Sequence, residues 1–187
     1  GQPIIFDVKS SAALGQLIAE LGAVPVMHRS GHSFMKQKML ETNAPLGGEY
    51  AAHVFIKDRW FGFDDGLYAA ARVVESISQQ DHSSAVEFAS YKTPISTDEI
   101  SVAVSDEDKF ELVAQLQHNA DLPNCKIILL DGLRAEFEFG WGLVRASNTS
   151  PTLLLRFEAN THEQIEFIKA HFRALLLCVD KKLHLNF

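Results

Sequence analysis

The sequence predicts an α/β domain with a mixed, mainly parallel sheet, followed by a smaller α+β domain. Three observations lead to this division. The first 27 residues alternate strand, helix and strand, which is the order of a parallel crossover unit. Residues 81–98 show no strong helical period, so we place a boundary there. Beyond it, strand-like stretches are grouped between two helices, and we expect domains at residues 1–92 and 93–187.

The first half begins with PIIFDV, residues 3–8, a short apolar run typical of a buried strand. Ser10 or Ser11 can cap the start of a following helix, and Gly22 can end it. The apolar residues of that helix recur at helical spacing: Leu14, Leu17, Ile18 and Leu21. AVPVM at 23–27 is the second strand.

A polar segment follows, and then a second helix. The residues that mark the polar segment as loop are Gly31, His32, Gly47 and Gly48. We expect an extended stretch near Glu49–Ile56. Asp64 or Asp65 can then cap a helix. The apolar residues that share one face of this helix are Leu67, Ala70, Ala71 and Val74.

The second half reads as strands between two helices. EISVAV at 99–104 is strand-like, and Ser105 and Asp108 can open a helix that carries apolar residues at Phe110, Val113 and Ala114. Three later stretches are predicted strands: KIILL, RAEFEFG and TLLLRFE. Thr161 and Gln164 resemble a capping box. The last helix is marked by Ile165, Ile168, Phe172, Leu175, Leu176 and Val179.

The composition is that of a globular protein, with 47% hydrophobic and 22% charged residues. The net charge of −7 argues against nucleic-acid and anionic-membrane partners, which bind basic surfaces. No apolar run reaches the roughly 18 residues that span a membrane. Cys125 and Cys178 are too few for a disulfide framework, so a reducing cytoplasm fits. Because the chain starts at Gly1 and not Met, we expect a processed or truncated piece.

The stretch RASNTSP, residues 145–151, gathers groups that bind anions. Arg145 offers a planar fork suited to two oxygens, Ser147 and Thr149 offer hydroxyls, and Asn148 offers an amide. A tight turn can add backbone N–H groups. The stretch therefore predicts a phosphate site, although a polar turn whose arginine makes a surface ion pair is an equal alternative.

The strand after Pro151 explains how such a loop is held in place. Its alternation puts three apolar residues on one face: Leu153, Leu155 and Phe157. Arg156 points to the other face and can supply a second cation. We expect the apolar face to fix the loop to the core.

Two glycine-flanked loops place histidines where a ligand can approach: GHSFMK at 31–36 and GGEYAAHVF at 47–55. Glu49 in the second loop suits the hydroxyls of a sugar. The alternative for a loop histidine is simple solvation. His28, His32 and His53 also suggest a metal site, but no helix-spaced histidine pair with a carboxylate partner is present in the sequence.

The other carboxylate cluster is FDDG at 63–66. We interpret Asp64 and Asp65 as helix caps and not as metal ligands, because the first turn of the following helix needs acceptors for its N–H groups.

Together these stretches resemble the α-D-phosphohexomutase family, most closely its phosphomannomutase/phosphoglucomutase branch. The markers are IIFDVK, RSGHSFMK, GGEYAAHVFIKDRWFGFDDGLYAA and RASNTSPTLLLRFEA. The family has four domains around one cleft. The chain looks like the third domain without its first helix, which should expose an apolar face, and like the fourth domain, which is TATA-binding-protein-like.

The resemblance assigns roles to residues in the first domain. The family has a sugar-recognition loop G-E-x-S-G-H, and Glu49 and His53 match its carboxylate and its final histidine. Ala51 and Ala52 depart from the family's serine and glycine. His32 matches the histidine of the preceding loop, and Lys9 matches a lysine of the cleft.

In the second domain the resemblance implies that one set of residues holds the substrate's phosphate: Arg145, Ser147, Asn148, Thr149 and Arg156. It further implies reversible transfer of a phosphoryl group between positions 1 and 6 of a phosphorylated hexose. A phosphoserine, Mg2+ and a glucose 1,6-bisphosphate-type activator serve that reaction.

The family's reactive serine and its Mg2+ loop belong to N-terminal domains that do not match these residues. We therefore expect the chain alone to lack mutase activity. The alternatives are a non-catalytic phosphosugar-binding module and a phosphoglucosamine mutase of the same family.

Overall fold

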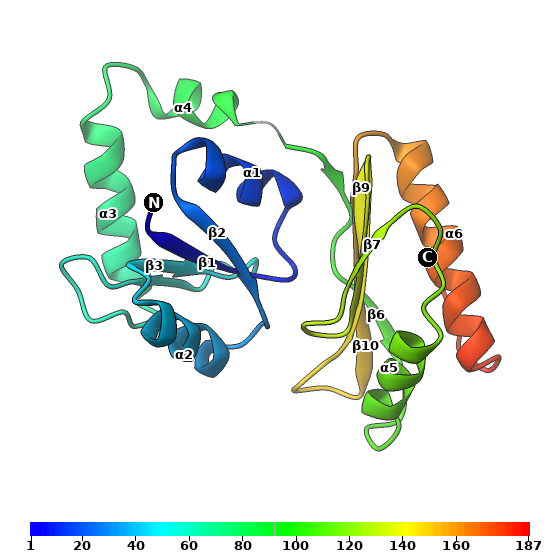
Figure 1. The fold of residues 1–187 in the computed structure, drawn as a ribbon. Helices are drawn as coiled ribbons and strands as arrows, with labels where there is room; N and C mark the ends of the chain where they lie inside the picture. The colour runs from blue at the N-terminus through cyan, green and yellow to red at the C-terminus, as the bar shows by residue number, and fades with distance from the viewer. Residues whose placement is uncertain (92) are drawn as a thin grey trace. The chain divides into compact units, whose positions relative to one another are not determined.

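The computed structural model describes residues 1–91 and 93–187, and these form two compact units, Gly1–Thr93 and Pro94–Phe187 (Figure 1). We call them unit 1 and unit 2. The expected boundary after residue 92 falls on a residue outside the described ones. Each unit has its own mixed or antiparallel sheet and its own helices, which confirms the predicted fold class.

Unit 1 begins with the predicted crossover. Strand β1 (Pro3–Asp7), helix α1 (Ala12–Glu20) and strand β2 (Val24–His28) follow in order, and β1 pairs with β2 in parallel. Ser11 caps α1 by accepting a hydrogen bond from the N–H of Ala13. Gly22 follows α1 with a φ of +76°, in the left-handed region that favours glycine.

The rest of the sheet in unit 1 differs from the prediction. Helix α2 (His32–Thr42) occupies most of the segment that we expected to be a polar loop, and that expectation was wrong. Strands β3 (Leu46–Gly48) and β4 (Val54–Ile56) complete the sheet in the order β2-β1-β3-β4. β3 is parallel to β1 and antiparallel to β4. The extended stretch expected from residue 49 is a turn until β4 begins.

The buried core of unit 1 is small. Among the described residues its core cluster consists of Ile5, Met35, Met39, Ala44 and Phe55, and Phe6, Val8 and Ile18 are buried outside that cluster. It joins the sheet to α2. An open groove beside α1 is lined by apolar side chains and glycines, including Phe6, Leu14 and Leu46. Leu14 and Leu46 are each 37% exposed, so this apolar surface is incompletely covered.

Helix α3 (Gly66–Ser78) has no buried residue. Its predicted apolar face is exposed: Leu67 is 88% and Val74 67% accessible. A short helix that the sequence did not predict, α4 (Ser84–Ser90), follows it.

Unit 2 is a sheet with two long helices. Its elements are β5 (Ile95–Ser96), β6 (Ile100–Ala103), α5 (Lys109–His118), β7 (Lys126–Ile128), β8 (Leu133–Phe137), β9 (Gly140–Ala146), β10 (Thr152–Ala159) and α6 (His162–Val179). The strand order is β5-β10-β9-β8-β7, with β6 beside the first half of β10. The β9–β10 hairpin therefore lies in the middle of the sheet. The sequence prediction did not include β9.

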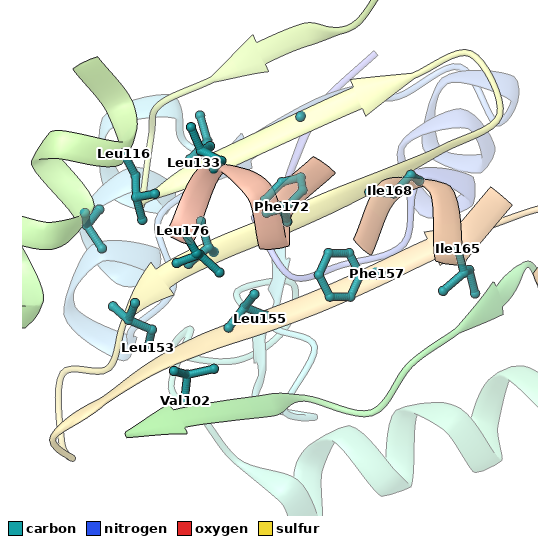
Figure 2. Packing of buried hydrophobic residues seen from close by; sticks show 14 of the residues in the cluster. Val102, Leu116, Leu133, Leu153, Leu155, Phe157, Ile165, Ile168, Phe172 and Leu176 are labelled. Carbon is teal, nitrogen blue, oxygen red and sulfur yellow. The ribbon is translucent and has the colours of Figure 1, made fainter. Parts of the chain in front are cut away.

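Helix α6 covers this hairpin and carries much of the core (Figure 2). All five of its buried residues were predicted: Ile165, Ile168, Phe172, Leu175 and Leu176. The predicted capping box between Thr161 and Gln164 is also present. Leu153, Leu155 and Phe157 of β10 are fully buried under α6, which confirms the predicted alternation.

In the described part of the chain, no helix has both the length and the apolar character needed to cross a membrane. Cys125 and Cys178 are both free thiols.

Candidate functional site

Asp7 organises the loops at the end of β1. It is fully buried, and its Oδ1 accepts from the Ser10 hydroxyl at 2.7 Å and the Tyr50 N–H at 3.1 Å. Its Oδ2 accepts from the Ser30 hydroxyl at 2.8 Å. One carboxylate therefore connects three loops that are far apart in sequence. Crevices outside the carboxyl ends of parallel strands are where open α/β sheets bind ligands.

Glu49 lies in one of these loops. Its Oε1 accepts from the N–H of Gly31 at 2.6 Å, at the start of α2. Its Oε2 is buried and has no hydrogen-bond partner among the described residues. An unsatisfied buried carboxylate oxygen is costly, which makes Oε2 a strong acceptor for a ligand hydroxyl.

The loop from Glu49 to His53 is a tight turn. The N–H of Glu49 donates to the His53 carbonyl at 2.9 Å, and the N–H of Ala52 donates to the Glu49 carbonyl at 3.0 Å. Ala52 has a φ of +64°, which glycine adopts more easily than alanine. This position is the one at which the sequence departs from the glycine of the loop pattern.

His32, His53 and Asp64 converge on one point. Asp64 Oδ2 lies 2.7 Å from His53 Nδ1 and 3.3 Å from His32 Nε2. The two imidazole rings are 4.3 Å apart between centroids. The carboxylate partner that the sequence did not reveal for these histidines is thus Asp64.

The helix cap predicted at Asp64 or Asp65 is confirmed at Asp65. Asp65 is the N-cap of α3 and accepts from the N–H of Tyr68 at 3.0 Å. Asp64 faces the histidines instead, so it remains a potential metal ligand. Because a carboxylate only accepts, this hydrogen bond requires a proton on His53 Nδ1, and in the neutral ring Nε2 is then an acceptor.

Lys9, the other residue proposed from sequence for this unit, follows β1. Its Nζ lies 5.8 Å from the centre of the Tyr50 ring. Tyr50 neighbours Glu49 and is held by Asp7, so Lys9 belongs to the same group of loops.

The loop between β9 and β10 in unit 2 is shaped by Ser147. This residue is buried, and its Oγ accepts from the N–H groups of Thr149 at 3.3 Å and Ser150 at 3.2 Å. Asn148 and Thr149 are exposed at the tip. Since two backbone N–H groups already donate to Ser147, the tip side chains are the donors that the loop presents outward.

Arg145 is fixed beside this loop by Asp131. Its Nε donates to Asp131 Oδ2 at 3.0 Å, and the side chains are 5% and 11% exposed. The two terminal nitrogens of Arg145 have no hydrogen-bond partner among the described residues. Gly132 makes the contact possible. A Cβ there would lie 2.2 Å from the carbonyl oxygen of Val144, so any side chain would push Asp131 away.

Arg156 of β10 lies opposite Leu143 of β9, and Arg145 of β9 lies opposite Leu154 of β10. The two arginines are therefore on the same face of the sheet, with Arg156 further from the loop. Its guanidinium carbon is 5.4 Å from the Trp141 ring, and that of Arg134 is 3.8 Å from it. Burial lowers the pKa of Arg134, an effect that nearby Glu136 partly offsets. This face of unit 2 is therefore rich in buried cations.

Lys109 ties the loop to helix α5. Its side chain is 5% exposed, and its Nζ donates to Asp106 Oδ1 at 2.6 Å and to the Ser150 carbonyl at 3.1 Å. The loop is thus held from both ends, by Ser147 within the hairpin and by Lys109 from the helix.

Residues 1–93 match the family model of phosphoglucomutase/phosphomannomutase alpha/beta/alpha domain III, and residues 99–175 match that of the C-terminal domain. The chain belongs to the phosphoglucomutase/phosphomannomutase family. Phosphomannomutase/phosphoglucomutase of Pseudomonas aeruginosa is 49% identical over 187 residues, which is 100% of this chain and 40% of the relative. Phosphoglucomutase of Neisseria meningitidis is 44% identical over 178 residues, covering 94% of the chain and 38% of the relative.

Solved structures agree with this membership. A phosphoglucomutase/phosphomannomutase family protein from Burkholderia thailandensis is 38% identical with a TM-score of 0.92, covering 100% of this chain and 40% of that one. N-acetylphosphoglucosamine mutase of Aspergillus fumigatus, in complex with glucose 1,6-bisphosphate, is 12% identical with a TM-score of 0.63 and shares the fold. The match covers 93% of this chain and 38% of the Aspergillus fumigatus mutase. The chain thus spans about 40% of the length of the relatives that it matches.

Sequence reasoning missed several residues that shape the site: Asp7, Asp64, Lys109 and Asp131. Asp7 could have been found from the sequence, because it is a polar residue at the end of a buried strand, where open α/β sheets bind ligands. Asp131 and Gly132 come directly before β8. The contact between Asp131 and Arg145 depends on the pairing of β8 with β9, which the sequence does not reveal.

Proposed function

We propose that this chain is the substrate-holding part of a phosphomannomutase/phosphoglucomutase that interconverts hexose 1-phosphates and hexose 6-phosphates through a bisphosphorylated sugar. In this proposal unit 2 binds the phosphate that is not reacting, and unit 1 binds the sugar. The phosphoserine that exchanges the phosphoryl group belongs to the rest of the protein. A relative's complex with glucose 1,6-bisphosphate supports the bisphosphorylated intermediate.

The geometry of Arg145 carries the proposal. Asp131 takes its Nε, so the two terminal nitrogens remain as a fork of fixed orientation. Such a fork binds two phosphate oxygens with charge-assisted hydrogen bonds. Asn148 and Thr149 extend from the tip of the same rigid loop and can donate to the third oxygen. Ser147 shapes the loop, and Arg156 adds positive charge along the strand.

The sugar is proposed to bind at Glu49 and His53. Glu49 Oε2 is a buried acceptor that a sugar hydroxyl can satisfy, while Oε1 stays on Gly31. His53 is held by Asp64 through Nδ1, so Nε2 of the neutral ring can accept a proton from a hydroxyl that attacks a phosphoryl group. Lys9 adds positive charge nearby, and His32 packs against His53 with ring centroids 4.3 Å apart. This arrangement provides positioning, which together with electrostatic stabilisation dominates phosphoryl transfer, and it adds a proton acceptor.

Mg2+ serves the family reaction, but the described residues do not fit it. Their one group of three or more potential metal ligands is His32, His53 and Asp64, with two nitrogens and one carboxylate. Mg2+ prefers six oxygen ligands. We therefore assign Mg2+ and its electrostatic role to another part of the protein. The two free cysteines support a reducing, cytoplasmic compartment.

The test is a titration of the 187-residue protein with glucose 6-phosphate. Arg145→Ala should weaken binding by about tenfold to a hundredfold, because one charge-assisted fork is worth roughly 1.5–3 kcal/mol. Arg173→Ala is the matched control, since Arg173 is an arginine of the same unit that contacts Phe187 and not the loop. Equal binding by Arg145→Ala and Arg173→Ala would refute the phosphate role of Arg145.

A further inference from the structure

The cluster of His32, His53 and Asp64 has the composition of a transition-metal site. Two imidazoles and one carboxylate are ligands that Zn2+, Co2+ and Ni2+ accept readily. The three ligand atoms come from the first turn of α2, the residue before β4 and the residue that bridges to Phe55. All of them lie within 4.8 Å of one another.

The distances are close to those that a bound ion imposes. Zn–N and Zn–O bonds of about 2.0–2.2 Å set tetrahedral ligands roughly 3.4 Å apart. The carboxylate oxygen is now 2.7 Å from His53 Nδ1 and 3.3 Å from His32 Nε2. Small side-chain rotations therefore open the cluster enough to place an ion between its members.

The surroundings favour entry of an ion. The side chains of His32 and His53 are 45% and 42% exposed, and that of Asp64 is 25% exposed. Solvent therefore reaches the cluster, and a water or a ligand oxygen can complete the coordination. The ring of His32 rests edge-on against Phe55, which is buried and limits its movement.

We propose that His32, His53 and Asp64 form a binding site for a divalent transition-metal ion such as Zn2+. For the ion to bind His53 Nδ1 and His32 Nε2, the proton that each neutral ring directs at Asp64 moves through solvent to the other nitrogen of the same ring. His53 Nε2 then becomes a donor. Resting on the proposed function, this predicts that the ion inhibits by removing the proton acceptor and competing with the phosphosugar.

The direct experiment is titration of the untagged 187-residue protein with Co2+, followed by its visible absorption, and with Zn2+ by calorimetry. We expect one ion per chain and the intense absorption of a tetrahedral Co2+ site. His32→Gln, His53→Gln and Asp64→Asn should each weaken binding by at least about tenfold. His82→Gln is the matched control, because His82 also pairs with one carboxylate, Glu87 at 2.7 Å, but has no second histidine.

Histidine side-chain NMR gives a second measurement that needs no variant. Zn2+ should shift the ring nitrogens of His32 and His53 before those of the other histidines. Unselective shifts, or affinity unchanged in all three cluster variants, would overturn the metal site.

Glucose 6-phosphate should raise the apparent Kd for Zn2+. Absence of this competition, with binding that still depends on the cluster, would overturn the inhibition and the sugar role of His53 while retaining the metal site. Loss of phosphosugar binding in Arg145→Ala tests the proposed function independently of both outcomes.

Discussion

Units 1 and 2 hold their candidate binding loops in different ways. Among the described residues, the core cluster of unit 2 contains seventeen buried residues and that of unit 1 only five. The loop of unit 2 closes a hairpin in the middle of a packed sheet. The loops of unit 1 meet at one buried carboxylate, Asp7. Packing therefore fixes the strands that carry the proposed phosphate loop, which Ser147 and Lys109 also hold by hydrogen bonds, whereas the proposed sugar loops depend mainly on polar contacts.

This difference predicts which substitutions each unit tolerates. Unit 2 should be sensitive to cavities and unit 1 to the loss of a buried hydrogen-bond acceptor. Each unit contains one tryptophan, Trp60 in unit 1 and Trp141 in unit 2. Their two indole N–H signals in NMR spectra report unfolding of the units separately.

The largest effect is expected from Phe172→Ala. Phe172 is fully buried and lies edge-on to Phe157, with ring centres 5.4 Å apart. The cavity should lower the free energy of unfolding of unit 2 by about 4 kcal/mol. Urea unfolding followed at the Trp141 signal measures it. Phe172→Leu fills most of the space and should cost less than about 1.5 kcal/mol; similar losses in both variants would show that packing does not dominate here.

Asp7→Ala should produce the largest loss in unit 1. It leaves two buried hydroxyls and the Tyr50 N–H without their acceptor, at a cost of about 3 kcal/mol. The Trp60 signal in urea unfolding measures the change, and the Trp141 signal should respond little. Asp81→Ala, at an exposed aspartate, is the control and should be neutral. A neutral Asp7→Ala would break the contrast between the two units.

Asp131→Asn sharpens the comparison within unit 2. The amide can still accept from Arg145 Nε but no longer balances its charge, and it can orient the other way. We expect phosphate binding to weaken by about tenfold with the fold unchanged, because the guanidinium loses the ion pair that fixes the orientation of its fork. Calorimetry with inorganic phosphate measures this loss. Asp121→Asn, at an exposed site of the same unit, should bind normally.

Ala52→Gly should have the smallest effect, and in the stabilising direction. Ala52 adopts a φ of +64°, where a Cβ costs roughly 1–2 kcal/mol. Glycine removes this cost but gains freedom in the unfolded chain, so we expect a net gain of about 0.5 kcal/mol in unit 1. Ala51→Gly, at a neighbouring position without positive φ, should destabilise by a similar amount. Thermal unfolding of both variants decides the sign.

The sequence predicted best where apolar spacing and capping coincide. Helix α6 shows both, with a capping box at Thr161 and a regular row of core residues. Helix α2 was missed because only Met35 and Met39 are buried and its N-cap, Gly31, makes no side-chain hydrogen bond. Strand β9 was missed because glycines interrupt its alternation. Gly142 is one of them, and a Cβ there would lie 2.6 Å from the Phe172 ring.

The site was predicted in part for a similar reason. The phosphate-loop and sugar-loop residues stand together in short motifs that a single sequence displays. Asp64 was assigned to a helix cap because two adjacent aspartates both fit that role locally. Only the pairing of Phe55 with Asp64 turns this carboxylate toward the histidines. Partners that come from separate strands cannot be recognised by spacing alone.

The most direct test of the account is NMR titration of the 187-residue protein, first with inorganic phosphate and then with glucose 6-phosphate. Phosphate alone should shift the Arg145 side chain and the backbone signals of Asn148 and Thr149, and leave Glu49 and His53 unchanged. Glucose 6-phosphate should shift both groups. If phosphate leaves residues 145–149 unperturbed, the proposed phosphate role of unit 2 is wrong, and if the phosphosugar never shifts Glu49 or His53, the proposed sugar role of unit 1 is wrong.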